Sequence, residues 1–131
     1  MYGDQVNKYG KAKLKNNWLN FVMSDSSLKK FKNKHNKYSI VNTDVKSGPG
    51  KHYCALYINN NTFYIFDTYS NPNQLKTFIN NIKKNKMKYK FSDLSDNEQV
   101  NYGKLKTACG ALSLSWLLLV KEIGIKNAMK L

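Results

Sequence analysis

The chain has 131 residues, 41% of them hydrophobic and 13% aromatic, which is enough apolar material for one core and excludes a globally disordered chain. Its length fits a single domain spanning residues 1–131. Its formal net charge is +14, because it has 22 basic residues, all of them lysines, and only 8 acidic residues. No apolar run reaches the roughly 18–20 residues of a membrane span, and the polar N-terminus lacks a signal segment, so we expect neither membrane insertion nor secretion.

The first third of the chain predicts one helix, a strand and connecting loops. Asp4 is a candidate N-cap for a lysine-rich helix that runs to about Lys15. The segments that follow are an apolar stretch at 18–23, a basic surface loop or short helix at 29–37, a strand at 38–42 and a loop at 47–50.

The strongest local prediction is a β-hairpin. Residues 53–58 and 62–66 have the apolar and aromatic composition of buried strands. The asparagines at 59–61 tolerate the positive φ angles of a tight turn, so the two strands are expected to pair antiparallel.

The second half of the chain alternates again between helix and strand. Leu75, Phe78, Ile79 and Ile82 follow the period of an amphipathic helix. Residues 87–91 alternate apolar side chains with lysines, as an edge strand does, and a polar loop follows from 92 to about 106. A mostly apolar helix is predicted over 109–123 with Gly124 as its C-cap. This order of elements predicts an α+β fold.

Pairing within the hairpin brings a histidine toward an acid. A turn at Asn59-Asn60 places His52 directly opposite Asp67, whereas a turn at Asn60-Asn61 makes the two residues diagonal neighbours. Both registers put the two side chains on one face of the sheet, and a register between them would separate the faces. A carboxylate beside an imidazole fixes the tautomer and stabilises the imidazolium.

Cys109 is the candidate nucleophile, because it begins an apolar helix whose N-terminus lowers the pKa of a thiol. Its backbone N–H has no partner within the helix and can donate to an oxyanion, while Gly110 leaves room for a substrate backbone. Gln99 and Asn101, in the preceding loop, are candidate second donors. A structural alternative stays open for each residue, since a cysteine in an apolar helix and a histidine at a strand start are commonly core residues.

The remaining polar and aromatic candidates have simpler interpretations. Cys54 lies on the same strand face as His52 and is either a core residue or a thiol near the site. His35 is expected at the surface, and Trp18 and Trp116 in the core. Two cysteines are too few for a disulfide scaffold, and without a CxxC motif or a Cys/His cluster we expect no metal ligands.

The lysine excess has two compatible interpretations. It favours a polyanion partner such as DNA or RNA, and it is equally the composition that an AT-rich genome encodes. Because the chain has no arginine, bidentate recognition of guanine is not expected, so any nucleic-acid binding should be non-specific.

Three blocks of sequence resemble the adenovirus-type cysteine proteases, the adenain/Ulp-like superfamily. The order is histidine, acid, cysteine: an aromatic follows His52 at Tyr53, Asp67 ends a strand after Phe66, and Ala-Cys-Gly opens the apolar helix at Cys109. The short chain rich in lysine and asparagine is most similar to the compact versions of virophages and Polinton-like elements.

The resemblance implies a mixed central sheet with the Cys109 helix packed against it, and peptide hydrolysis by a Cys109–His52–Asp67 triad. It further implies an oxyanion hole completed by Gln99 or Asn101, and substrate contacts at Tyr53 and Gly110. The expected substrates are viral capsid or structural precursors cleaved at small, glycine-containing sites.

The resemblance also sets expectations about partners and place. No cofactor is required, although DNA or a peptide could activate such an enzyme, and a monomer in the virion and the host-cell cytoplasm is expected. Two other functions stay open: a SUMO-type deconjugating protease, and an inactive basic DNA-binding packaging protein.

Overall fold

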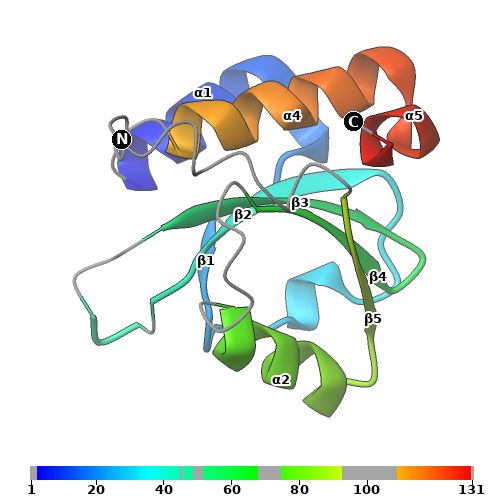
Figure 1. Cartoon of the computed structure of the whole chain (residues 1–131). Helices are drawn as coiled ribbons and strands as arrows, with labels where there is room; N and C mark the ends of the chain where they lie inside the picture. Colours follow the sequence, from blue (N-terminus) through cyan, green and yellow to red (C-terminus); the bar gives the residue numbers. More distant parts are fainter. Residues whose placement is uncertain (1–2, 45, 49–51, 68–74, 93–108, 131) are drawn as a thin grey trace.

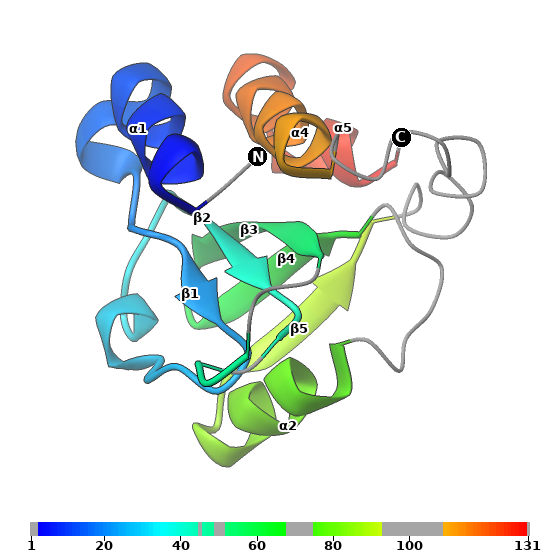
Figure 2. The ribbon, with the colours of Figure 1, turned by 90° about the vertical axis from the view of Figure 1, so that its left-hand side faces the viewer.

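A computed structural model describes residues 3–44, 46–48, 52–67, 75–92 and 109–130. The chain forms an α+β fold in which one mixed sheet is covered by helices on both faces (Figure 1). Helices α1, α4 and α5 lie over one face, and α2 lies over the other, as the perpendicular view also shows (Figure 2). The predicted fold class is therefore confirmed.

The sheet has five strands in the order β1-β2-β3-β4-β5. The three central strands pair antiparallel, while the edge strands β1 and β5 pair parallel with β2 and β4, which makes the sheet mixed. The strands are β1 (Val22–Met23), β2 (Lys37–Asn42), β3 (Tyr53–Asn59), β4 (Thr62–Phe66) and β5 (Lys88–Phe91).

Four α-helices and two short 3₁₀ turns complete the described part of the chain. They are α1 (Gly3–Leu14), η1 (Lys15–Asn17), η2 (Lys29–Phe31), α2 (Lys76–Lys84), α4 (Cys109–Ile123) and α5 (Ile125–Met129). None of the helices formed by the described residues is long and apolar enough to cross a membrane.

Strand alternation divides the interior into two cores. On β3, Tyr53, Ala55 and Tyr57 pack with residues of α1 and α4, whereas Leu56 and Ile58 pack with residues of α2. Successive side chains of a strand point to opposite faces, so a central strand covered on both faces must be apolar throughout. This explains why every residue of β3 before its last is buried.

The hairpin turn settles the register that the sequence left open. Asn60 and Asn61 have φ angles of 51° and 60°, as the central residues of a type I′ turn require. Asn59 pairs with Thr62 and Ala55 pairs with Phe66. Of the two registers considered, the turn at Asn60-Asn61 is the one formed.

Most predicted elements are confirmed within a residue or two, including the exposed edge lysines Lys88 and Lys90 on β5. Gly124 directly follows α4, where it was predicted, and its φ of 85° and ψ of 157° are a conformation that suits glycine and that joins α4 to α5. The short helix α5 was not predicted, because no apolar period separates it from α4. Trp18 and Trp116 are core residues, as expected.

Candidate active site

A buried histidine–carboxylate pair lies at one end of the central hairpin. His52 immediately precedes β3 and Asp67 immediately follows β4, so the strands deliver both side chains to the same end of the sheet. His52 Nε2 and Asp67 Oδ1 are 2.7 Å apart, and the two residues are only 4% and 2% exposed. The register makes them diagonal neighbours on one face.

The backbone around His52 is fixed by the adjacent strand. The N–H of Thr43 donates to the carbonyl of His52 over 2.7 Å, and the N–H of His52 donates to Thr43 Oγ1 over 3.3 Å. These bonds continue the β2–β3 pairing one residue beyond the strand itself. The imidazole is therefore carried on a backbone with little freedom to move.

Cys54 belongs to the same cluster. The register that pairs Ala55 with Phe66 puts Cys54 opposite Asp67, and Cys54 is fully buried. One donor atom from each of His52, Cys54 and Asp67 lies within 4.8 Å of the others. Sequence reasoning missed this grouping as a possible ligand set. The available signal was the spacing of His52 and Cys54, two residues apart on one strand.

Helix α4 begins at Cys109, as the sequence predicts. The side chain of Cys109 lies outside the described residues, but the next turn of α4 is well placed. Ser113 Oγ donates to the carbonyl of Tyr53 over 3.3 Å, and the rings of Trp116 and Phe66 stack with centroids 5.4 Å apart. These contacts attach α4 to the sheet at Tyr53 and Phe66, the chain neighbours of His52 and Asp67.

The two contacts also give the direction of α4 over β3 (Figure 1). From Ser113 to Trp116 the helix advances from Tyr53 toward Phe66, which is the partner of Ala55. Helix and strand therefore advance the same way. Since Cys109 precedes Ser113 by four residues, about 6 Å along the axis and on the same helix face, its backbone lies toward the His52 end of the sheet.

The other predicted site residues occupy different settings. Gln99 and Asn101 lie outside the described residues. Tyr53 is 9% exposed and packs edge-on against Phe21, and Gly110 is buried in the first turn of α4. His35 is exposed, as expected for a surface residue.

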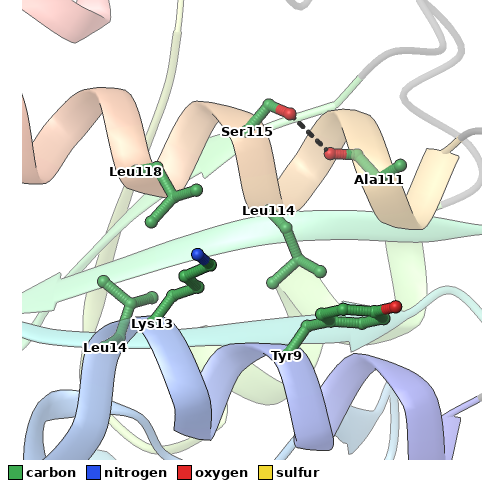
Figure 3. A pocket seen from close by; sticks show the side chains of 7 residues that line it. All are labelled: Tyr9, Lys13, Leu14, Ala111, Leu114, Ser115 and Leu118. Atoms are coloured by element: carbon green, nitrogen blue, oxygen red, sulfur yellow. Dashed lines mark hydrogen bonds between the residues drawn. The ribbon is translucent and has the colours of Figure 1, made fainter.

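A separate cavity of about 220 Å³ lies between α1 and α4 (Figure 3). It shares no lining residue with the histidine–carboxylate cluster, and its α4 residues lie on other sides of the helix than Ser113. Its lining is Tyr9, Lys13, Leu14, Ala111, Leu114, Ser115 and Leu118.

The chemical capacity of the cluster follows from its hydrogen bond. With Nε2–H donating to the Asp67 carboxylate, the second ring nitrogen, Nδ1, is the atom through which His52 would accept and return a proton. The Asp67 charge would stabilise the imidazolium formed in that step. The pair is thus equipped for general acid–base chemistry.

Ser113 and Thr43 are the supporting residues that sequence reasoning missed. Ser113 interrupts the apolar face of α4 four residues after Cys109, which was the available signal. Thr43 belongs to the segment before His52 that resembles the protease family, but no local pattern marked it as a partner of His52. Comparison with known proteins adds no assignment, since neither a scan of protein-family models nor a search of curated proteins finds a match.

Proposed function

We propose that the protein is a cysteine endopeptidase with Cys109 as nucleophile, His52 as general base and acid, and Asp67 as the residue that orients His52. The observation that carries the proposal is the buried 2.7 Å pair of His52 and Asp67, which lies at the end of the sheet toward which α4 begins. A buried carboxylate is costly unless it is hydrogen-bonded or paired, and Asp67 meets this requirement through an imidazole.

The reaction begins when the Cys109 thiol transfers its proton to His52 Nδ1. The thiolate attacks the peptide carbonyl, a C–S bond forms, and the C=O electron pair moves onto oxygen. When that pair returns, the C–N bond breaks and the leaving amine takes the proton from His52. Water, deprotonated by His52, then hydrolyses the thioester.

The position of Cys109 at the start of α4 supports its role. The first backbone N–H groups of a helix have no intrahelical acceptor, and the helix dipole is positive there. Both effects favour a thiolate and an adjacent oxyanion. The following residue, Gly110, has no side chain to obstruct an extended substrate. Gln99 or Asn101 is proposed as the second oxyanion donor.

The finer family assignment is part of the same proposal. Chain order His52, Asp67, Cys109, a mixed sheet and a helix that begins at the cysteine together suit an adenain/Ulp-like protease. The proposed substrates are viral structural precursors, cleaved beside small residues such as glycine. Exposed lysines on both helical layers suit an enzyme that works among polyanions.

The deciding experiment digests a proteome-derived peptide library with the wild type and with Cys109→Ala. New termini after small residues should form with the wild type only. His52→Gln should abolish cleavage, and His35→Gln, which changes the exposed histidine, should retain it. Equal cleavage by wild type and Cys109→Ala would end the proposal. Rapid labelling of Cys109 by a diglycine-terminated SUMO probe would redirect the substrate class to ubiquitin-like conjugates.

A further inference from the structure

We propose that His52, Cys54 and Asp67 form a binding site for Zn²⁺, and that the bound metal blocks the hydrolase. The site stands on the geometry of these three residues, whereas its inhibitory consequence rests on the proposed function. Nothing in the proposed catalytic steps uses Cys54, although its sulfur lies within 4.8 Å of both partners' donor atoms.

The donor set selects the metal. A thiolate sulfur, an imidazole nitrogen and a carboxylate oxygen are the three ligand types that protein zinc sites combine. Hard cations such as Mg²⁺ and Ca²⁺ require oxygen ligands and are not suited to this set. Three protein ligands also leave the fourth tetrahedral position to a water molecule or another donor.

The distances require only a small adjustment. Tetrahedral zinc, with bonds of about 2.0–2.3 Å, holds its donor atoms roughly 3.3–3.6 Å apart. The Nε2–Oδ1 distance of 2.7 Å must open by about 0.6–0.9 Å, and the distances to sulfur, at most 4.8 Å, must close by no more than about 1.2–1.5 Å. The Cys54 thiol loses its proton to solvent when the Zn–S bond forms. When His52 binds the metal through Nε2, the proton leaves that nitrogen and the neutral ring carries its proton on Nδ1.

The scaffold is suited to hold a metal in place. Cys54 and Asp67 are opposed across the β3–β4 ladder, and His52 is two residues before Cys54 on the same face. β3 is paired on both sides, so the backbone that carries His52 and Cys54 is fixed. Binding sites on rigid strands hold their ligands more accurately than those on loops.

Zinc and catalysis would exclude each other. Zn²⁺ on the His52–Asp67 pair replaces the hydrogen bond that orients the imidazole, and a metal-bound imidazole cannot exchange the catalytic proton at the same time. The enzyme would therefore be reversibly silenced by zinc and restored by a chelator.

Cobalt provides a direct test, because Co²⁺ takes zinc sites and a Co²⁺–thiolate bond gives a charge-transfer absorption band. The protein has two cysteines, so in Cys109→Ala only Cys54 can produce that band. We expect the band at one equivalent of Co²⁺, displacement by Zn²⁺, and loss of the band in the Cys54→Ala/Cys109→Ala double variant. A folded Cys109→Ala protein without the band would overturn the site.

Zinc affinity and inhibition are then measured separately. By competition with a chromophoric chelator, Cys54→Ala should bind Zn²⁺ at least about 100-fold more weakly than wild type, and His35→Gln within about twofold. A Cys54→Ala affinity equal to wild type would refute the assignment. Inhibition is the rate with zinc divided by the rate without it for each variant. Equal inhibition of wild type and Cys54→Ala would refute the regulatory step, while an inactive wild type that binds cobalt would reject only the protease proposal.

Discussion

At the scale of single residues, the Asp67 carboxylate carries a heavy share of the proposed chemistry. It is 2% exposed and bonded to His52 Nε2, so it decides which ring nitrogen carries the proton. An amide of the same shape can present its NH₂ group to Nε2 and favour the opposite tautomer. The positions of the two side chains would be preserved, but the proton of the His52 ring would lie on the wrong nitrogen.

Asp67→Asn should therefore lower kcat by about 10⁴-fold with little change in KM, as loss of an orienting carboxylate does in catalytic triads. The measurement is steady-state hydrolysis of a peptide found by the library digest. Asp25→Asn, which neutralises an exposed acid, is the matched control and should retain full activity. A D67N protein whose kcat is within tenfold of wild type would remove Asp67 from the proposed mechanism.

Gly10 is a second position where one atom matters. A Cβ at Gly10 would lie 2.3 Å from ring atoms of Trp18, closer than any non-bonded contact allows. In a helix, alanine is intrinsically better than glycine by about 1 kcal/mol. Here the added methyl group would be forced against Trp18, a core residue that cannot easily shift. Such overpacking typically costs about 1–3 kcal/mol and opposes the gain in helix preference.

Gly10→Ala is thus expected to destabilise the protein by about 1–2 kcal/mol, against the intrinsic helix preference. Urea unfolding followed by circular dichroism measures the change. Lys11→Ala, at an exposed neighbouring position of α1, should alter the free energy of unfolding by no more than about 0.5 kcal/mol. A more stable Gly10→Ala protein would show that the Trp18 contact does not restrict this position.

At the scale of elements, the attachment of α4 to β3 positions the proposed nucleophile. The Ser113 hydroxyl donates to the Tyr53 carbonyl, while the stacked rings of Trp116 and Phe66 fix the next turn. Misplacement of a reacting atom by about 1 Å can reduce a rate about 100-fold. The hydroxyl of Ser113 is therefore a positioning contact.

Ser113→Ala should cost about 1 kcal/mol of stability and lower kcat about tenfold, because the first turn of α4 loses its bond to the sheet. Ser115→Ala is the control, since the Ser115 hydroxyl is exposed and donates within the helix to Ala111. Ser113→Thr, which keeps the hydroxyl, should recover part of the rate. If Ser113→Ala lost stability without any change in kcat, the contact would be structural only.

Tyr38 of β2 and Tyr57 of β3 are paired across the sheet, and these two phenols make the stability of the fold sensitive to high pH. Burial raises the pKa of Tyr38, and the neighbouring Tyr57 raises it further; burial and Tyr64 likewise raise the pKa of Tyr57. Both hydroxyls donate to Asn36 Oδ1. As the pH rises, these phenols ionise in the unfolded chain before they ionise in the folded one. Their contribution to the stability of the fold is therefore fully present below the unfolded pKa of about 10.

Stability should consequently fall as pH rises above about 10, through the raised pKa values of the folded state. The slope of unfolding free energy against pH in this range should be shallower in Tyr57→Phe than in wild type. Tyr9→Phe, which changes a half-exposed tyrosine on α1, should leave the slope unchanged. Identical slopes in all three proteins would contradict the role of this tyrosine cluster.

At the scale of the whole molecule, charge is the dominant surface property. Almost all described lysines are exposed, whereas the exposed carboxylates among the described residues are Asp4, Asp25 and Glu122. Such a surface attracts any polyanion, and each phosphate contact releases bound counterions. The same charge would concentrate the protein on nucleic acid without selecting a sequence.

Binding to duplex DNA should therefore weaken steeply with salt, with a slope in a log–log plot of about −0.9 for each phosphate contacted. Fluorescence anisotropy with two duplexes of unrelated sequence measures this, and both should give the same affinity within about threefold. Heparin should compete. Affinity that is independent of salt, or a strong preference for one duplex, would contradict the electrostatic account.

The fold was largely predictable because its signals are local. Apolar alternation, the asparagine turn and the period of Leu75, Phe78 and Ile82 each identify an element from neighbouring residues. The His52–Asp67 pair was predictable for the same reason, as hairpin parity fixes which residues share a face. Cys54 as a ligand and Ser113 as an anchor depend on distances between elements, which neither periodicity nor composition encodes.

The turn at Asn60-Asn61 stands at the far end of the hairpin from the candidate site, yet its length controls the chemistry proposed there. Removing one asparagine would slide β4 past β3 by a single step and turn Asp67 to the face of the sheet opposite His52. The two loop residues therefore work as a spacer, and natural variation in chain length should be tolerated almost anywhere on the surface except at this bend.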